Sequence, residues 1–386
     1  MNKLIKATEV RICDDDYNEL AVLDTYETLT YTERFSGRDS WDLTIKRGAK
    51  NTEYLTKGRI LHMLENTPQK NIRCLIIKQI NVDGDPKHKS ESDMITISGN
   101  DYASVLLEGR RILDGTDTST GYDVQTGDAE SVMRHYISAN LTAATVEARG
   151  DPVFRLEAVN QNRGSSVTFN GRFQSLLEML ESCCSSGGNL GWEAVVVEDD
   201  VVDWGWMLEW RLREGLDRSE TQDVNSPIVL SEEHGTAKIT EFCDTLPETN
   251  LVIVGGQGEA AARTQLTVGD ETLTGIWRRE SFIDGRDSDD TEALTERGQE
   301  VIDNAISTSF MMTCLESASC IYGEQFQIGD IVSVDAGVYG AYDLQVVTVT
   351  TTYATKKSIG LTLGSEIKDV YRIVRDISRS IPDIRK

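Results

Sequence analysis

One glycine motif in the chain has the spacing of a nucleotide-binding loop. Residues 251–254 have the pattern of an apolar strand, and Gly256, Gly258 and Ala261 follow as Gly-x-Gly-x-x-Ala. In a dinucleotide-binding fold, these glycines let the backbone approach a pyrophosphate at the N-terminus of a helix. Here a strand pattern resumes at Gln265, which leaves no room for that helix. We therefore interpret the glycines as a bend at a strand end and expect no cofactor. A nucleotide-dependent enzyme built on this motif ranks last among the functions that we consider.

Histidine and acidic residues give no metal-binding or catalytic constellation. The histidines, which are scattered along the chain, are His62, His88, His135 and His234. His62 and Glu65 have the spacing of helical metal ligands, but they lie in a strand pattern, where this spacing points side chains to opposite faces. The acidic clusters at residues 14–16, 198–200 and 287–290 lack the glycine and closing glutamate of a calcium loop. We expect no catalytic, cofactor-binding or metal-binding residue.

Tryptophans concentrate in one short stretch of the chain. Trp192, Trp204, Trp206 and Trp210 lie in a predicted hairpin that turns at residues 198–200. Aromatic faces stack on sugars, so this stretch and an acidic pair would suit a carbohydrate- or cell-wall-active enzyme, which we keep as an alternative function. Cross-strand aromatic packing explains the same residues without a ligand, and we favour it.

Cysteine usage indicates a reducing compartment. The seven cysteines are Cys13, Cys74, Cys183, Cys184, Cys243, Cys314 and Cys320. Their number is odd, their spacing is irregular and no C-x-x-C pair occurs, so we expect free and mostly buried thiols. A disulfide between the adjacent Cys183 and Cys184 would be strained, and their place at the end of an amphipathic helix indicates core packing.

The composition is that of a soluble, strongly acidic protein. The 386 residues include 64 acidic and 39 basic ones, for a net charge of -25, and 39% are hydrophobic. Such a surface repels phosphate, so reading of DNA sequence and docking on anionic membranes are excluded. General solubility, adaptation to high salt and a conduit that nucleic acid crosses without sticking all remain open explanations. The N-terminus has no secretory leader pattern and no run is long enough to span a bilayer, so we expect synthesis in the cytoplasm and no membrane insertion.

Hydrophobic periodicity predicts strands, then a mixed region, then strands again. In the first hundred residues, Leu29, Tyr31 and Phe35 share one predicted strand face, and similar alternation recurs between glycine-containing turns. Helical patterns begin at the predicted N-caps Asp101 and Asp128 and recur over residues 173–180, 291–306 and 367–380. Further strand patterns lie at residues 238–242, 251–254, 266–268, 273–277, 326–334, 344–353 and 359–363. Short strands with regular turns indicate a barrel or a sandwich.

Several short motifs occur in an order that is informative. The segment 250–259 has Arg263 shortly after it, residues 295–298 read Thr-Glu-Arg-Gly, and residues 328–332 and 360–364 are two further glycine-containing strands. Together they resemble the signature of siphovirus tail-hub proteins of the tail-associated type, and they match best in the second half of the chain. The glycines and the aspartate that carry this resemblance are Gly255, Gly256, Gly258, Gly298, Gly329, Asp330 and Gly364.

The resemblance implies a mainly β, α+β fold similar to the baseplate hub of contractile T-even phages. It would contain two tube-type β-barrel domains, an inserted α/β domain and a short C-terminal helix. The implied boundaries are residues 1–100 for the first barrel, 101–225 with 260–308 for the α/β domain, 226–259 with 309–366 for the second barrel, and 367–386 for the helix. Three such chains would present six barrels, and so adapt a sixfold tail tube to a threefold tail tip.

The implied function is structural and not enzymatic. The chain would form a homotrimer at the tail tip of the virion and pass the genome through an acidic lumen without specific binding. Its implied partners are a distal tail or tail tube protein, a tape measure protein and a separate fibre or receptor-binding protein. Many relatives carry a long C-terminal extension with a cell-wall hydrolase or fibre, whereas this sequence has a single helical pattern there. We therefore expect any hydrolase or receptor binder to be a separate protein, and the terminal helix either to dock that partner or to pack on its own barrel.

Overall fold

The computed structural model describes residues 9–364, apart from residues 24, 66–70, 83–92, 114–120, 145, 223–225, 245, 260–261, 287–289, 304, 306–307 and 318–319. Contacts divide the chain into two compact units, which are treated separately below. The first unit comprises Met1–Ile239 and Met312–Leu361, and the second comprises Thr240–Met311 and Thr362–Lys386. The predicted C-terminal helix, residues 367–386, lies outside the described residues.

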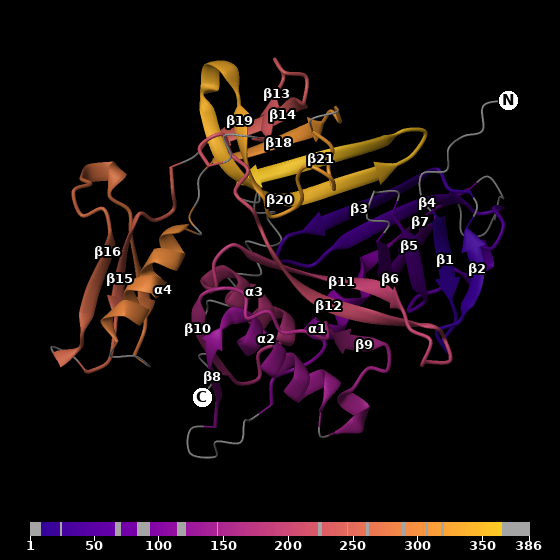
Figure 1. The fold of residues 1–386 in the computed structure, drawn as a ribbon, viewed down its shortest axis with the longest axis horizontal. Helices are drawn as coiled ribbons and strands as arrows, with labels where there is room; N and C mark the ends of the chain where they lie inside the picture. The colour runs from indigo at the N-terminus through magenta and orange to yellow at the C-terminus, as the bar shows by residue number, and fades with distance from the viewer. Residues whose placement is uncertain are drawn as a thin grey trace. The chain divides into compact units, whose positions relative to one another are not determined.

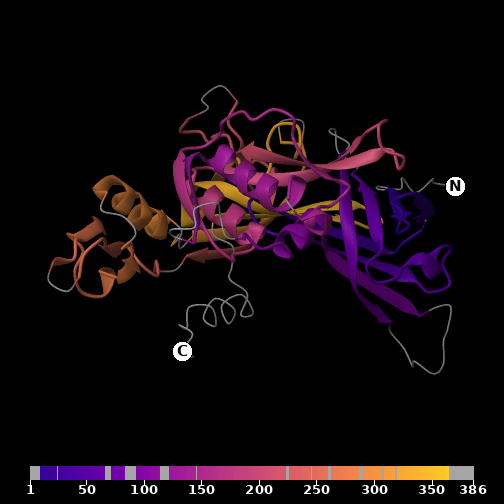
Figure 2. The same ribbon diagram turned by 90° about the horizontal axis from the view of Figure 1, so that it is seen from below.

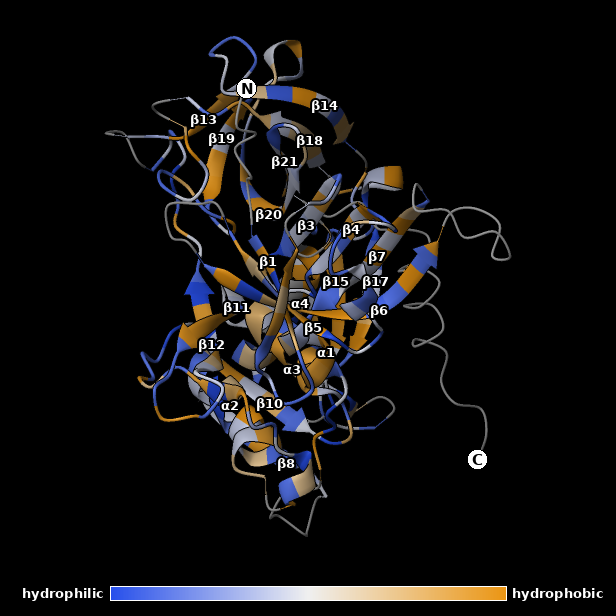
Figure 3. Cartoon of the chain, turned by 90° about the vertical axis from the view of Figure 1, so that its right-hand side faces the viewer, coloured by the Kyte–Doolittle hydropathy of each residue, from blue (hydrophilic) through white to orange (hydrophobic). Residues whose placement is uncertain are grey.

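The first unit begins with an antiparallel sheet made by the first hundred residues (Figure 1). Its strands are β1 (Glu9–Cys13), β2 (Glu19–Leu23), β3 (Thr28–Arg34), β4 (Ser40–Lys46), β5 (Ile60–Leu64), β6 (Ile72–Val82) and β7 (Met94–Asp101). They pair in the order β3-β4-β7-β6-β5-β1-β2. Buried and partly exposed residues alternate along β3 and β4, as the sequence predicts, because successive side chains of a strand point to opposite faces. Figure 3, which is coloured by hydropathy, shows both orange and blue bands along strands of this sheet, as on β6.

Strands from the end of the chain extend this sheet. They are β19 (Ile331–Asp335), β20 (Ala341–Tyr353) and β21 (Lys357–Gly364), together with the earlier β13 (Val229–Ser231). The long strand β20 pairs antiparallel with both β19 and β3, and places Val349 opposite Glu33. Residues more than three hundred positions apart therefore share one sheet, as the yellow and indigo strands of Figure 1 show.

In the sequence, a mixed α/β region lies between the strands of the first hundred residues and those from the end of the chain. It consists of α1 (Tyr102–Glu108), β8 (Asp123–Asp128), α2 (Ala129–Ile137), β9 (Phe154–Leu156), β10 (Ser166–Gly171), α3 (Leu176–Ser186), β11 (Leu190–Glu198) and β12 (Trp206–Glu214). The helices and the β11–β12 hairpin share one core (Figure 2). The predicted N-caps are confirmed, since Asp101 accepts a hydrogen bond from Ser104 N at 2.7 Å and Asp128 accepts one from Ser131 N at 2.8 Å.

One helix boundary was predicted too early. Phe173 lies before α3, in a left-handed backbone conformation with φ 63°, and its side chain is 54% exposed. The helix begins instead at a capping box in which Ser175 accepts a hydrogen bond from Glu178 N and the Glu178 carboxylate accepts one from Ser175 N. The apolar spacing of residue 173 matched the helix, but the capping residues set its start.

The second unit is a small three-stranded sheet with a helix on one face. Strand β15 (Leu251–Gly255) lies between β16 (Gln265–Gly269), which is antiparallel to it, and β17 (Glu280–Asp284), which is parallel. The helix α4 (Thr291–Asp303) packs its Leu294 against Val252, Val254 and Val268. In the sequence, β14 (Ala237–Asp244) precedes this sheet and β18 (Thr308–Cys314) follows it.

The predicted strand at residues 273–277 is wrong. A single 3-10 turn, Gly275–Trp277, occupies this position, and the strand β17 follows it at Glu280–Asp284. Thr274 is extended, but Gly275 has φ 60°, a conformation that interrupts a strand and that glycine adopts without strain. The apolar residues Ile276 and Trp277 gave a strand pattern, although both are exposed at 72% and 58%.

The predicted fold class is confirmed as mainly β with an α/β portion. Within the part of the chain that is described, the strands form open paths, and no pairing closes them into a barrel. The arrangement as two barrels, with the domain boundaries given above, therefore stays a prediction.

Candidate functional site

The glycine motif of the second unit is closed by an arginine. Strand β15 ends at Gly255, and Arg263 returns to this point, where its Nη2 donates to Gly255 O at 2.8 Å and its Nε donates to Gly256 O at 3.1 Å. The same guanidinium pairs with Asp284 and lies over the Phe282 ring, 5.4 Å from the ring centroid. Gly255 O also accepts a hydrogen bond from Gly285 N at 2.7 Å, so the guanidinium gives this carbonyl a second donor and supplies a donor to Gly256 O.

The glycines are required here by close approach and by backbone conformation. A Cβ atom on Gly255 would lie 2.6 Å from Arg263 Nη2, so the guanidinium occupies the space of a side chain. Gly258 has φ +113°, which residues with a side chain rarely adopt. Gly255 is the last residue of β15, and the next strand among the described residues is β16 at Gln265. This placement agrees with the interpretation of the glycines as a bend at a strand end.

Gly298 lets the helix α4 approach its sheet. A Cβ atom at this position would lie 2.7 Å from Val268 Cγ2 and 3.1 Å from Val254 Cγ2. Because these valines form the core of the second unit, a larger residue would push the helix away from the sheet. The last motif glycine, Gly364, ends β21 with φ 80°.

The Gly329–Asp330 pair makes a tight turn in the first unit. Gly329 has φ +92°, and a Cβ atom there would lie 2.1 Å from the Phe35 ring. The buried Asp330 carboxylate accepts hydrogen bonds from Leu216 N at 2.9 Å and from Arg218 Nε at 3.0 Å. This turn therefore connects strand β19 to the chain that leaves the β11–β12 hairpin and to Phe35, which follows β3.

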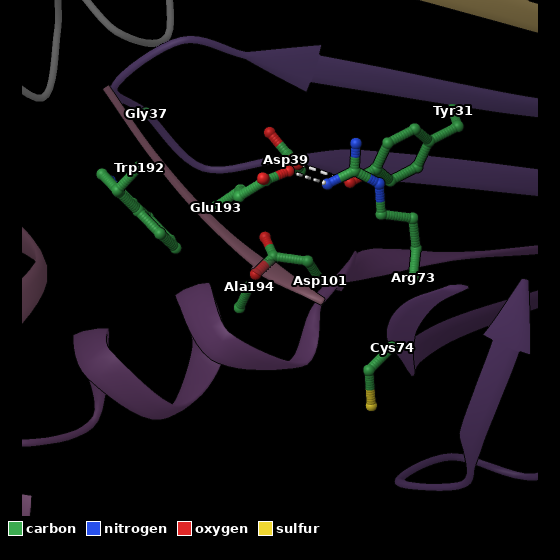
Figure 4. Close-up of a pocket in the computed structure, with 9 residues that line it drawn as sticks. All are labelled: Tyr31, Gly37, Asp39, Arg73, Cys74, Asp101, Trp192, Glu193 and Ala194. Carbon is green, nitrogen blue, oxygen red and sulfur yellow. Dashed lines mark hydrogen bonds and ion pairs between the residues drawn. The ribbon is translucent and has the colours of Figure 1, made fainter. Parts of the chain in front are cut away.

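A second arginine, which the sequence did not identify, joins the same parts of the first unit from within. The Arg73 guanidinium, which is 5% exposed, lies 3.0 Å from Glu33 Oε1, 3.0 Å from Glu193 Oε2 and 3.2 Å from Glu65 Oε1. Arg213 Nη1 lies 2.8 Å from Glu33 Oε1, so Glu33 bridges the two guanidiniums. Figure 4 shows the ion pair between Arg73 and Glu193 at a small pocket that Tyr31, Asp39, Asp101 and Trp192 also line. We use the name Arg73 network for the two arginines, their carboxylate partners and the polar residues beside them: Arg73, Arg213, Glu33, Glu65, Glu193, Tyr31, Asp39 and Asp101.

The Arg73 network connects three segments that are far apart in the sequence. Glu33 lies on β3, Glu193 lies on β11, and the Tyr322 hydroxyl, from the segment between β18 and β19, donates to Glu33 Oε2 at 3.0 Å. Buried charges are stable only when they are paired, so each segment supplies a charge or a donor that the other segments need. The network therefore joins the strands of the first hundred residues, the mixed α/β region and the segment that precedes β19 within the first unit.

Burial and pairing shift the protonation of this network in opposite directions. Burial alone raises the pKa of the Glu33 carboxyl, but the Arg73 and Arg213 guanidiniums outweigh it and hold the pKa at about 2. Burial, with the charges of Asp101 and Glu33 added, raises the pKa of Asp39 to about 8. Asp39 accepts hydrogen bonds from Arg34 N at 2.7 Å and from the Tyr31 hydroxyl. The cluster thus holds a permanent carboxylate beside a carboxyl that carries a proton at neutral pH.

The remaining candidates that the structure describes form no site, whereas His88 and residues 287–289 lie outside the described residues. His62 is buried in β5 against the Trp206 ring, and burial lowers its pKa to about 4. Among the described residues, no three His, Cys, Asp or Glu side chains are placed to hold a metal ion. None of the described helices has both the length and the apolar character needed to cross a bilayer.

The tryptophan hairpin packs inward. Its turn lies between β11 and β12, as predicted, and Trp192, Trp206 and Trp210 are 4%, 7% and 0% exposed. Trp206 Nε1 donates to Tyr17 O at 3.0 Å, and Trp192 Nε1 donates to Ser36 O at 3.2 Å. These rings therefore join the hairpin to the first sheet and present no open face to a sugar, which confirms the interpretation as packing.

Comparison with known proteins identifies the family. The profile of the Siphovirus ReqiPepy6 Gp37-like protein family matches residues 9–365. The chain belongs to this family. Its predicted membership of a siphovirus tail protein family is thereby confirmed. A search of curated proteins finds no match.

Solved structures share the fold over nearly the whole chain. The 43 kDa tail protein of prophage MuSo2 from Shewanella oneidensis matches with a TM-score of 0.58 and 11% identity, over 93% of this chain and 98% of that chain. The tail protein from Neisseria meningitidis MC58 matches with a TM-score of 0.55 and 15% identity, over 93% and 96%. Prophage tail protein gp18 from Listeria monocytogenes EGD-e matches with a TM-score of 0.54 and 12% identity, over 97% and 98%. At these identities the likeness concerns the fold.

Proposed function

We propose that this chain is the tail hub of a tailed virus, a structural protein that forms a trimeric ring at the distal end of the tail tube. The observation that carries the proposal is the fold: three solved tail proteins, two of them from prophages, match it over 93% or more of both chains. The match to a siphovirus family over residues 9–365 agrees with this assignment.

Symmetry adaptation is the mechanical role that we assign to the protein. With one tube-type barrel at residues 1–100 and a second at residues 226–259 and 309–366, three chains place six similar modules in a ring. The pairing of β20 with β3 supports this arrangement, because it ties the two predicted barrels to each other within one chain. The Arg73 network adds a buried polar connection between Glu33 on β3 and Tyr322, in the segment between β18 and β19.

The lumen of such a ring is expected to be acidic. The net charge is -25, and a conduit lined by carboxylates repels the phosphates of a passing genome and so does not retain it. The neighbours in this arrangement are the distal tail or tail tube protein, the tape measure protein and a separate fibre or receptor-binding protein. A neutral or basic lumen in the assembled ring would refute this part of the proposal.

The alternative of a cell-wall-active enzyme depends on an exposed aromatic platform. Three of the four hairpin tryptophans are buried, so the platform on which that alternative rested is not available for sugar stacking. We therefore favour the structural role.

The oligomeric state tests the proposal directly. Native mass spectrometry and sedimentation of the purified 42.9 kDa chain, alone and with the adjacent tail proteins, should give a species of three chains. A cryo-electron microscopy reconstruction of the tail tip should then place six barrel-shaped densities around the channel. A chain that stays monomeric in every mixture, or turnover of cell-wall material that one carboxylate substitution abolishes, would contradict the hub assignment.

A further inference from the structure

An exposed aromatic residue of the first unit is held in a strained backbone conformation. Phe173 has φ 63°, which bulky residues rarely adopt, and its side chain is 54% exposed. Two hydrogen bonds fix this turn, since Phe173 N donates to Ile112 O at 2.8 Å and Ile112 N donates to Gln174 O at 2.9 Å. Strain of this kind clusters at functional sites, and here it does not bury the ring. The backbone therefore presents an aromatic face to the surface.

The outer face of a two-stranded sheet continues the surface around Phe173. Tyr122 and Val124 lie two residues apart at the start of β8, so they share one face, and they are 40% and 50% exposed. The Arg172 guanidinium lies over both neighbouring rings, 5.3 Å from the centroid of Tyr122 and 5.2 Å from that of Phe173. We use the name Phe173 patch for Tyr122, Val124, Arg172 and Phe173. Apolar surface around one cation fits an apolar side chain that has carboxylates beside it.

The turn between β11 and β12 has this complementary chemistry. Val201 is 92% exposed, and the carboxylates of Asp200 and Asp203 are exposed on either side of it. Val201 N donates to Asp199 Oδ1 at 2.9 Å, so the turn has its own hydrogen bonding. We call this turn, residues 199–205, the hairpin tip. It offers an apolar side chain and negative charge on a preorganised backbone, which lowers the entropic cost of binding.

We propose that the Phe173 patch binds the hairpin tip of a second copy of this chain. In this contact Val201 packs on the rings of Tyr122 and Phe173, and the carboxylates beside it pair with the Arg172 guanidinium. Charge favours this occupant, because a chain with a net charge of -25 offers carboxylates to its neighbours, whereas the patch contributes a cation.

The patch and the tip are different surfaces, so the contact between copies is head-to-tail. Figure 1 shows β8 and β10 at one end of the mixed α/β region and the turn between β11 and β12 at the other. A contact of this kind repeats from copy to copy and forms a ring when the rotation closes. The inference rests on the proposed function, since the ring that it connects is the proposed trimer, in which each copy gives its hairpin tip to the next.

Native mass spectrometry of paired variants tests the contact. Phe173→Asp in the patch and Val201→Asp in the tip each add a repelling charge, and each alone should weaken trimer formation by about tenfold or more. An equimolar mixture of the two variants should give dimers with one copy of each, because one intact tip and one intact patch remain and the ring cannot close. Val338→Asp is the matched control, since Val338 is 95% exposed in the turn between β19 and β20, and it should form trimers as the wild type does.

The folding of the variants is measured separately, at a concentration where the wild type is monomeric. All three substitutions are at exposed positions, so the unfolding temperatures should stay close to that of the wild type. Phe173→Gly should not lower the unfolding temperature, because glycine adopts φ 63° without strain, but it should weaken trimer formation. This combination distinguishes a ring that is kept for the contact from one that is kept for the fold.

Cross-linking identifies the surface that the patch contacts. With p-benzoylphenylalanine in place of Phe173, and with isotope-labelled and unlabelled copies mixed in one trimer, light should join the patch to residues 199–205 of a second copy. Cross-links to another surface or to another tail protein, or single variants that form trimers as readily as the wild type, would overturn the inference and leave the hub assignment standing. A wild-type chain that stays monomeric in every mixture would remove the hub assignment, and this contact with it.

Discussion

The two units each use one arginine to join chain segments, but with different partners. Arg73 in the first unit is 5% exposed and is surrounded by the carboxylates of Glu33, Glu65 and Glu193. Arg263 in the second unit donates mainly to the carbonyl oxygens of Gly255 and Gly256, with Asp284 as its one carboxylate among the ion pairs described. One arginine thus neutralises buried charge, and the other completes the hydrogen bonding of a loop.

This difference has energetic consequences. Removal of one partner from a buried ion cluster leaves charges without compensation, which costs several times more than the loss of a neutral hydrogen bond. The first unit therefore depends strongly on its arginine for global stability, whereas the second unit depends on its arginine for local order. Four experiments separate these two kinds of dependence.

The largest effect is expected from Arg73→Met. The substitution keeps most of the side-chain volume but leaves Glu33, Glu65 and Glu193 facing one another without this cation, and the expected loss is about 3–5 kcal/mol of unfolding free energy. Chemical denaturation of the full chain measures it. Arg11→Met is the matched control, because the Arg11 side chain is 45% exposed and its pair with Glu9 should contribute about 0–1 kcal/mol. A loss of less than about 1 kcal/mol for Arg73→Met would show that Arg73 contributes no more to stability than the exposed Arg11.

A smaller but still large effect is expected from Gly329→Ala. The new methyl group would meet the Phe35 ring at 2.1 Å, and the backbone would have to keep φ +92°. Overpacking costs about 1–3 kcal/mol and the left-handed conformation about 1–2 kcal/mol. Gly58→Ala isolates the second contribution, since Gly58 has φ +84° and no atom within 4 Å of the added methyl group. Equal losses in the two variants would mean that contact with Phe35 is unimportant, and a second change, Phe35→Leu, should recover part of the loss only in the Gly329 variant.

Arg263→Met should produce a local effect of about 1–3 kcal/mol, because the Gly256 carbonyl loses the Arg263 donor and the Gly255 carbonyl keeps only the bond from Gly285 N among those described. Hydrogen exchange should accelerate in residues 255–264, while the amides of β3 and β6 keep their protection. Arg286→Met is the control, since Arg286 is 67% exposed and also faces Asp284. If exchange accelerates equally in both units, the comparison drawn above fails.

The sequence predicted these two arginines unequally, for a physical reason. Glycines with defined spacing marked the loop that Arg263 closes, because positive φ angles and close approaches restrict residue type locally. The N-caps Asp101 and Asp128 were also predictable from local sequence, because a side-chain oxygen at that position accepts a hydrogen bond from the first turn of the helix. The Arg73 network has no such local pattern, since Glu33, Glu193 and Tyr322 meet only after distant strands pair. Phe35 and Trp192 were predicted as strand residues, but the pairing of β20 with β3 could not be read from periodicity, which fixes the face of a residue and not its neighbouring strand.

The smallest effect is expected from Asp39, which tests whether the Arg73 network holds a proton. The folded-state pKa of Asp39, about 8, lies above its ordinary value, so its contribution to stability is complete at low pH and is lost as the pH rises through 8. Glu33 acts in the opposite direction, because its folded-state pKa of about 2 lies below its ordinary value. Its contribution to the unfolding free energy is complete when the pH is above that ordinary pKa, and it is lost as the pH falls towards 2. From pH 7 to pH 8 the unfolding free energy should therefore fall by about 1 kcal/mol.

Asp39→Asn, which imitates the protonated carboxyl, should remove this slope, and Asp15→Asn, at a side chain that is 91% exposed, should retain it. Unfolding curves at several pH values measure the slope, and an unchanged slope in Asp39→Asn would place the proton elsewhere in the cluster, with Glu65 and Asp101 as the carboxyls whose pKa burial also raises.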